Sequence, residues 1–323
     1  MGRVLVLVTH ADGAADDVSL QALTFARRFA AGAAVDAVVI GPGAAGAAGG
    51  LGAYGAGTVH VADHPDLASF APDAWARIVV DLAEAVDAEA VVGPGTEAGN
   101  EVLARVAARI DEPLAANCTA VTAGSPITLT RIRWGGSLLE EARLHPARRA
   151  LLTVAPHAVA AEPSGGAADV RSFAPALDEA DLAVRVKERI GAATGGVSLA
   201  DAKVVVTGGR GVGSAEGFAP IEDVASLLGG AVGCSRAVTI AGWRAHTDQV
   251  GQTGTKIAPE IYFCCGVSGA TQHMAGCKGA KKILAINKDA DAPIMTRADY
   301  AVIGDLHEIL PAIAAEIRRV RGA

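Results

Sequence analysis

Aromatic residues and positive charge are both scarce in this chain of 323 residues, and each shortage excludes a class of protein. Phe, Trp and Tyr make up only 4% of the sequence while hydrophobic residues reach 51%, so the core must consist mainly of small aliphatic side chains. That composition suits sheets buried between helices. The formal net charge of -7 gives no electrostatic reason to bind nucleic acid or an anionic membrane. We therefore expect no nucleic-acid partner.

Cysteines and long apolar runs are also few. The five cysteines are an odd number without CxxC spacing, which disfavours a disulfide scaffold and a zinc or iron-sulfur site, so we expect no metal. No apolar stretch reaches about 18 residues without glycine or charge, so no membrane span is expected. A strand-like run begins at residue 3, with no signal peptide before it, and we expect a cytoplasmic protein.

Strand-like and helix-like stretches alternate along the first part of the chain. The patterns predict strands at 3–8, 35–40 and 90–92, and helices at 17–31, 73–86 and from about residue 96. Such α/β alternation is typical of a parallel sheet. From 127 to 154 the pattern changes to short apolar runs on either side of Trp134-Gly135-Gly136, which predicts a hairpin.

Two segments rich in Gly, Pro, Ser and Ala, 162–166 and 191–196, have the composition of linkers. Between them, residues 182–188 alternate apolar and polar side chains, which predicts one more strand of the first domain. The second segment is the better boundary. We therefore predict an N-terminal α/β domain at 1–195 and a C-terminal domain at 196–323.

A second α/β unit begins with a strand at 203–206, a glycine loop at 208–214 and a helix at about 216–228. Glycines let the backbone approach a phosphate, and a helix after the loop presents free N–H groups to it. The loop does not have regular GxGxxG spacing, and it carries no Walker lysine. A tight strand-to-helix turn without a ligand explains the loop equally well.

Several short motifs follow in a fixed order, and they carry most of the functional information. In chain order they are Ser235-Arg236, Gln249-Val250-Gly251-Gln252-Thr253-Gly254, Gly266-Val267-Ser268-Gly269-Ala270-Thr271-Gln272-His273, Ala285-Ile286-Asn287-Lys288-Asp289, Ala292-Pro293-Ile294, Ala298-Asp299-Tyr300 and Gly304-Asp305-Leu306. This order resembles the FAD-binding signature of the electron-transfer flavoprotein α-subunit family, closely over about 203–310 and more loosely over the N-terminal domain.

The resemblance implies a fold and a set of cofactor-binding residues. It implies an N-terminal α/β domain of the nucleotide-hydrolase-like type and a C-terminal doubly wound parallel-sheet domain that binds FAD. It also places Arg236 over the isoalloxazine ring, Thr253 near N5 and His273 near the C2 carbonyl. The implied FAD-binding residues are Arg210, Ser235, Arg236, Val250, Gly251, Gln252, Thr253, Ser268, Gly269, Ala270, Thr271, Gln272, His273, Asn287, Asp305 and Leu306.

The residue types at these positions have chemistry that suits a flavin. Arg236 is a permanent planar cation, able to lie against a ring or neutralise a phosphate. Thr253 and Ser268 carry short hydroxyls, and His273 can present a proton or a charge. Taken alone, Arg236 could instead form a surface ion pair, and His273 could be a hydrogen-bonded structural residue.

The resemblance implies an electron carrier rather than an enzyme: a flavoprotein of electron transport that forms a heterodimer with a β subunit. Reduced dehydrogenases, such as the acyl-CoA dehydrogenases of fatty acid β-oxidation, would donate electrons, and a quinone oxidoreductase would accept them. Two alternatives stay open, an NADH-linked electron-bifurcating complex in which the β subunit holds a second FAD, and a nucleotide sensor that uses only the glycine loop.

One motif departs from the family pattern. The family usually has Ala-Val-Asp-Ala-Gly where this chain has Val238-Thr239-Ile240-Ala241-Gly242, so an acid near Arg236 is lost. The flavin-facing motifs survive, and we expect the departure to affect the flavin potential more than FAD binding.

Overall fold

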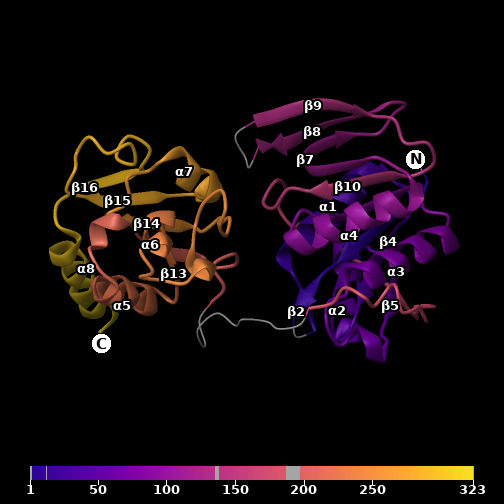
Figure 1. The fold of residues 1–323 in the computed structure, drawn as a ribbon, viewed down its shortest axis with the longest axis horizontal. Helices are drawn as coiled ribbons and strands as arrows, with labels where there is room; N and C mark the ends of the chain where they lie inside the picture. Colours follow the sequence, from indigo (N-terminus) through magenta and orange to yellow (C-terminus); the bar gives the residue numbers. More distant parts are fainter. Residues whose placement is uncertain (1, 12, 135–137, 187–196, 323) are drawn as a thin grey trace. The chain divides into compact units, whose positions relative to one another are not determined.

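The chain divides into two compact units, Met1–Arg189 and Ile190–Ala323, in the computed structural model (Figure 1). The structure describes residues 2–11, 13–134, 138–186 and 197–322. Within these ranges, no helix is both long and apolar enough to cross a membrane, and no cluster of His, Cys, Asp or Glu could hold a metal ion.

Among the described residues of the first unit, a nine-stranded sheet forms the centre. Its order is β11-β5-β4-β1-β6-β10-β7-β8-β9, with parallel pairing from β11 to β7. In chain order the strands are β1 (Val4–Val8), β4 (Val35–Ile40), β5 (Thr58–Ala62), β6 (Ala90–Pro94), β7 (Leu114–Thr122), β8 (Ile127–Arg133), β9 (Leu138–Leu144), β10 (Ala150–Val154) and β11 (Asp169–Ser172), beside a small β2 (His10–Ala11) and β3 (Ala14–Ala15) ribbon. The α/β class and parallel sheet predicted from the sequence are confirmed.

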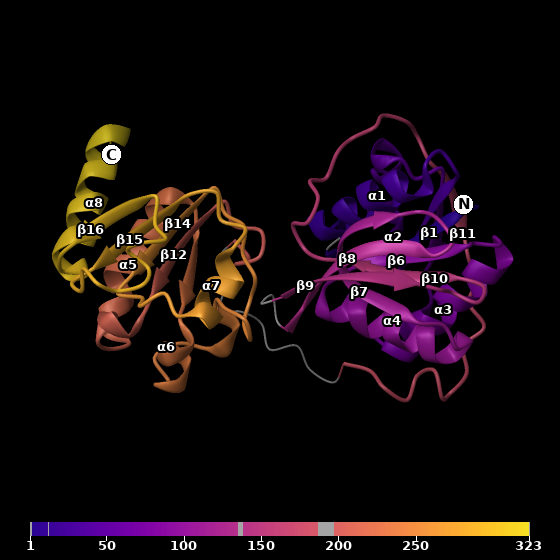
Figure 2. The same ribbon diagram turned by 90° about the horizontal axis from the view of Figure 1, so that it is seen from above.

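Helices cover both faces of this sheet (Figure 2). One face packs against α1 (Asp17–Ala30) and α2 (Ala44–Ala48), the other against α3 (Pro72–Ala85) and α4 (Glu97–Ile110). Alternate residues of β1 enter the two cores, Val4, Val6 and Val8 on one side and Leu5 and Leu7 on the other. This burial on both faces explains why the strand reads as an unbroken apolar run.

The predicted hairpin is confirmed. Strands β8 and β9 pair antiparallel from Ile127 opposite Leu144 to Arg133 opposite Leu138, and β7 pairs antiparallel with β8. The residues of the predicted turn at 135–137 lie outside the described part of the chain.

The strand predicted at 182–188 is wrong over its described part, 182–186, which contains no strand. The strand that joins the sheet edge is β11, parallel to β5. The segment 162–166 does not leave the unit, because Ser164 N–H donates to Ala53 O, 2.8 Å away, before the chain enters β11. The other predicted linker, 191–196, and residues 187–188 lie outside the described residues.

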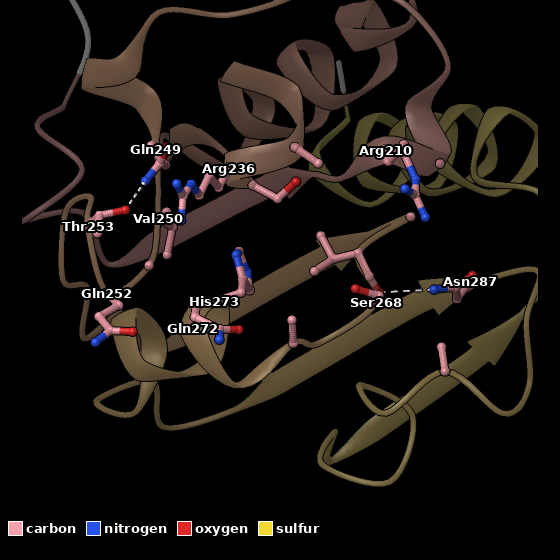
Figure 3. A pocket seen from close by; sticks show the side chains of 18 of the residues that line it. Arg210, Arg236, Gln249, Val250, Gln252, Thr253, Ser268, Gln272, His273 and Asn287 are labelled. Carbon is pink, nitrogen blue, oxygen red and sulfur yellow. Dashed lines mark hydrogen bonds between the residues drawn. The ribbon is translucent and has the colours of Figure 1, made fainter. Parts of the chain in front are cut away.

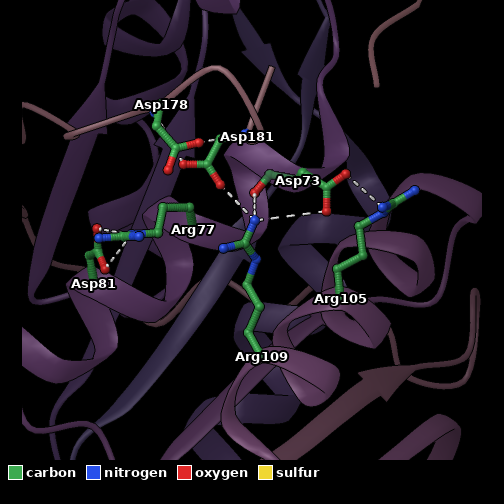
Figure 4. A network of polar contacts seen from close by, with 7 residues as sticks. All are labelled: Asp73, Arg77, Asp81, Arg105, Arg109, Asp178 and Asp181. Atoms are coloured by element: carbon green, nitrogen blue, oxygen red, sulfur yellow. Dashed lines mark hydrogen bonds and ion pairs between the residues drawn. The ribbon is translucent and has the colours of Figure 1, made fainter. Parts of the chain in front are cut away.

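After β11 the chain crosses α3 and α4 as a strap, residues 173–186, held by apolar contacts and by a polar network (Figure 4). Phe173, Leu177 and Leu182 pack against the core that those helices share with the sheet. The carboxylate of Asp181, whose side chain is only 3% exposed, accepts a 2.6 Å hydrogen bond from Arg109 Nη2 of α4. Of the apolar residues at 182–186, Leu182 packs against this core whereas Val184 is 46% exposed, so the alternation does not mark a buried strand face.

The second unit contains a five-stranded, all-parallel sheet in the order β13-β12-β14-β15-β16. Its strands are β12 (Val204–Gly208), β13 (Ala231–Cys234), β14 (Ile261–Cys265), β15 (Ile283–Asn287) and β16 (Tyr300–Ile303). On one face pack α5 (Ala219–Leu228) and α8 (Leu306–Arg321), and on the other α7 (Thr271–Cys277), with a short α6 (Arg236–Ile240) after β13. This arrangement is the doubly wound domain that the resemblance implied.

The Arg109–Asp181 ion pair generates the first prediction. Replacing Arg109 with Ala leaves a buried carboxylate with only the Asp178 backbone N–H as donor, so we expect the first unit to lose about 2 kcal/mol of unfolding free energy in urea. Limited proteolysis within the strap should also become faster. The matched control is Arg77→Ala, which breaks the half-buried i,i+4 pair of Arg77 with Asp81 and should change stability by about 0.5 kcal/mol or less. Equal effects of the two substitutions would contradict the anchoring role of Asp181.

Candidate functional site

A cavity of about 490 Å³ opens at the carboxyl ends of the strands of the second unit (Figure 3). The chain passes from β12 to β13 on one side and then to β14 on the other side of β12, so the connections diverge at the β12–β14 boundary. Ligands of open α/β sheets bind in the crevice that forms at such a point. The fold alone therefore places a ligand site here.

The loop after β12 and the loop after β14 form the floor of this crevice by direct backbone contact. Gly209 N–H donates to Cys265 O at 2.8 Å, and Gly211 N–H donates to Gly266 O at 3.0 Å. A Cβ on Gly209 would lie 2.2 Å from Gly266 O, so no other residue fits without moving the loop. The contact leaves Arg210 exposed at the cavity.

The loop from Gln249 to Gly254 forms one side of the cavity. Val250 N–H donates to Cys234 O at 2.9 Å, and Gln252 N–H donates to Gln272 O at 2.7 Å. Gly251 has φ 150°, a conformation that side chains rarely adopt, and α7 packs so closely that a Cβ on Gly276 would lie 2.3 Å from Gly251 N. These contacts fix the loop that carries Gln252 and Thr253.

Two arginines supply the positive charge of the cavity. Arg236 lies toward its Thr253 end and Arg210 toward its Asn287 end (Figure 3). Both side chains are exposed, and neither forms an ion pair with another described residue. Unpaired guanidinium groups separated along an elongated cavity suit an anionic ligand that extends between them.

His273 is the buried polar group of the cavity wall. It is 7% exposed, and its Nε2 lies 2.7 Å from the hydroxyl of Tyr262, which is fully buried on β14. Its Nδ1 is buried and has no hydrogen-bond partner of good geometry. The nearby backbone of Val250 acts to raise the pKa of His273. Burial lowers the pKa of His273 to about 4, so the imidazole is neutral at neutral pH.

The far side of the cavity is held by Asn287 at the end of β15. Its Nδ2 donates to Val267 O at 3.0 Å, and its Oδ1 accepts from Asp289 N–H at 3.1 Å. This pair of bonds fixes the loop that carries Ser268, whose side chain is exposed at the cavity.

Most of the sequence-predicted residues line this one cavity. They are Arg210, Ser235, Arg236, Val250, Gly251, Gln252, Thr253, Ser268, Ala270, Gln272, His273 and Asn287. Four others lie around it without lining it, namely Gly269, Thr271, Asp305 and Leu306. Asp305 caps α8 through His307 N–H and pairs with Lys288, while Leu306 is buried in the core. Contact of each residue with the cofactor stays a prediction.

The sequence reading missed several lining residues, namely Gly211, Ala237, Gln249, Gly266, Val267, Asp289 and Ala292. Gln249 and Gly266 stand inside the motifs that were recognised, so the motifs contained a signal for them. Nothing in the sequence signals the contact of Tyr262 with His273, since the tyrosine lies within an apolar strand.

The cysteines do not belong to this polar site. All five are buried, and burial raises the pKa of each thiol, to about 12 for Cys118, Cys234, Cys265 and Cys277 and well above the usual value for Cys264. A thiolate is therefore disfavoured at every position.

These features define a class of protein, an α/β protein whose doubly wound domain has a positively charged cavity at its switch point. The comparisons with known proteins agree. Residues 198–278 match the model described as the electron transfer flavoprotein FAD-binding domain, and residues 4–178 match the electron transfer flavoprotein domain.

Relatives resemble this chain over its whole length. It is 40% identical to the electron transfer flavoprotein subunit alpha of Mycobacterium tuberculosis over 100% of both chains. Identity is 33% with the subunit alpha of Thermoanaerobacterium thermosaccharolyticum over 98% of both chains. With the protein FixB of Clostridium saccharobutylicum it is 36%, over 99% of this chain and 97% of the relative.

The chain belongs to the electron-transfer flavoprotein α-subunit family, and its cofactor is FAD. The residues of the cavity fit that group. FAD is anionic because of its two phosphates, and the two arginines give the cavity positive charge; its flavin ring carries carbonyls, and the buried Nδ1 of His273 is a hydrogen-bonding group in the cavity wall. Electron transfer, rather than bond-making chemistry on a substrate, is the activity of this family.

The lowered pKa of His273 generates the second prediction. Between about pH 6.5 and about 4 the unfolded chain binds a proton that the folded chain does not, so acidification through this window should destabilise the second unit. In this window, the free energy of unfolding should fall by at most about 1.4 kcal/mol per pH unit of acidification. Above pH 6.5, His273 should contribute no pH dependence. Denaturant unfolding of the chain free of FAD at several pH values measures it.

His273→Gln should remove that part of the pH dependence, whereas the same change at the exposed His246 should leave the dependence intact. If both variants keep the full slope below pH 6.5, His273 is not the group responsible.

Proposed function

We propose that this chain is the α subunit of a heterodimeric electron carrier that works in the cytoplasm with a β subunit. It would take electrons from flavin dehydrogenases, such as those acting on acyl-CoA in fatty acid β-oxidation, and pass them to a quinone oxidoreductase. The observation that carries the proposal is the cavity at the β12–β14 switch point, where two unpaired arginines and a buried neutral histidine converge.

We assign FAD binding to the residues predicted from the motifs. We also keep the predicted domain limits, 1–195 and 196–323. FAD, when bound, supplies the redox chemistry. Arg210 would neutralise phosphate charge, and Arg236 would place a cation beside the flavin ring. His273, held by the Tyr262 hydroxyl, would offer its Nδ1 to a ring carbonyl without adding a charge.

The relatives' names support the partnership, since several are called subunit alpha. The site supports it too. Thr253, Ser268 and Gln272 are exposed at the cavity, so this unit by itself gives a bound flavin only partial cover. A second chain across the opening would complete the enclosure.

Arg236 generates the third prediction. Arg236→Ala should weaken FAD binding by about 10- to 150-fold, because one charge-assisted contact contributes about 1.5–3 kcal/mol. It should also lower the flavin reduction potential, since a nearby cation favours the more negative reduced form. Fluorescence titration and redox titration of the heterodimer measure the two effects.

The control is Lys282→Ala, which removes a cation that pairs with Asp299 away from the cavity. We expect FAD affinity and potential to be unchanged in that variant. The assignment of Arg236 to the flavin fails if its replacement affects neither quantity while FAD stays bound.

The dependence on a partner is the fourth prediction. Expressed alone, the chain should hold FAD well below one equivalent, whereas co-expression with its β subunit should give a yellow heterodimer, because cofactor binding and assembly are linked. Absorption spectra and flavin extraction give the stoichiometry. One FAD per heterodimer supports the simple carrier, and two support the electron-bifurcating alternative. Tight stoichiometric FAD on the isolated chain would argue against the linkage.

A further inference from the structure

Three polar side chains beside the cavity form a chain of hydrogen bonds. Thr239 lies on α6, and Gln249 and Thr253 lie in the loop that forms one side of the cavity. The hydroxyl of Thr239 lies 2.8 Å from Gln249 Oε1, and Gln249 Nε2 donates to Thr253 Oγ1 at 3.0 Å. Figure 3 shows the second of these bonds at the end of the cavity where Arg236 lies.

Gln249 is held rigidly in the middle of this chain. It is only 2% exposed, so water cannot replace a lost partner of its amide. Its backbone is fixed as well, since Gln249 N–H donates to His246 O at 3.0 Å and Thr255 N–H donates to Gln249 O at 2.7 Å. A buried amide on a fixed backbone has few ways to satisfy both of its ends.

Thr239 favours one of the two orientations of this amide relative to Thr253. Its hydroxyl proton lies between two acceptors, Gln249 Oε1 at 2.8 Å and Arg236 O at 2.9 Å. As a donor to Oε1 it favours the orientation in which the amide nitrogen points at Thr253. Without that donor, nothing in the chain of bonds opposes a reversed amide, in which Oε1 would accept from Thr253 instead.

The consequence is a directed hydroxyl at the cavity. A threonine hydroxyl has one proton, and the Thr253 oxygen already accepts from Gln249. Its own proton is therefore free to be donated into the cavity that Thr253 lines. In the reversed arrangement the proton would point back at Gln249, and the cavity would meet a lone pair.

We propose that Thr239 and Gln249 are positioning residues that hold the Thr253 hydroxyl as a hydrogen-bond donor toward the bound flavin. The inference rests on the proposed FAD site. It assigns a role to Thr239, a residue at the place where the family pattern usually has valine and within the motif that departs from that pattern.

The test compares threonine variants in the heterodimer with its β subunit. Thr253→Val should raise the dissociation constant of FAD about fivefold, the effect of losing one hydrogen bond. Thr239→Val should raise it by a similar factor and shift the flavin absorption spectrum and reduction potential in the same direction. Thr239→Ser, which keeps the hydroxyl, should behave as the native protein.

The double variant Thr239→Val with Thr253→Val separates a positioning role from a structural one. If Thr239 acts through Thr253, the double variant should be no weaker than Thr253→Val alone. Gln249→Met, which removes both bonds and keeps the length of the side chain, should match Thr253→Val. The control is Thr247→Val, a nearby exposed threonine outside the cavity lining, which should change nothing.

Different outcomes overturn different claims. If Thr253→Val weakens FAD binding but neither Thr239→Val nor Gln249→Met changes affinity, spectrum or potential, the positioning role is wrong and the FAD site stands. Additive losses in the double variant also overturn the positioning role. A native heterodimer that binds no FAD would instead overturn the proposed function.

Discussion

The backbone contact between the loops after β12 and β14 is the constraint on which the site depends. Adjacent parallel strands release both loops at the same edge of the sheet, and the contact of Gly209 and Gly211 with Gly266 joins them there. Several of the residues that line the cavity are placed relative to that junction. Arg210 belongs to the first loop, while Ser268 and the start of α7, with His273, follow the second. A side chain on Gly209 would separate the loops and with them the two groups of ligand-facing residues.

The sequence predicts the parts of the fold that have a local signature. Buried parallel strands such as β1 read as apolar runs, and β8 and β9 contain short apolar runs on either side of Trp134-Gly135-Gly136 in the sequence, so both were recognised. The strand β11 has no such signature, because all four of its residues are exposed and its pairing depends only on the free edge of β5. The opposite error arose at 182–186, where the alternation is strand-like but only Leu182 packs against the helix-covered core and Val184 is exposed. In both places tertiary contacts, not local preference, decide the structure.

The candidate site likewise has parts that the sequence predicts and parts that only tertiary contacts decide. Motifs at the carboxyl ends of strands indicated which residues gather there, because strand ends of a parallel sheet meet at one edge. They could not indicate the contacts made behind the cavity wall. Tyr262 reaches His273 from β14, the strand that precedes α7, and Thr239 reaches Gln249 from α6, so these pairings depend on how the two helices pack. For Asp305 and Leu306 the motifs indicated a ligand contact, whereas the structure shows a role for each in the fold. Asp305 caps α8, and Leu306 is buried in the core.

Burial also settles a question of charge that residue types left open. A histidine beside a flavin could be an imidazolium or a neutral hydrogen-bonding group, and the enclosed position of His273 favours the neutral form. The permanent charge of the cavity is therefore carried by Arg210 and Arg236. Ile240 lies on α6 four residues, or one helical turn, after Arg236, and it is 75% exposed. The family pattern usually has an acid at this position. Ile240 offers Arg236 no ion-pair partner, and no other described residue forms an ion pair with it. In the proposed site, the charge of Arg236 would therefore be available to the flavin.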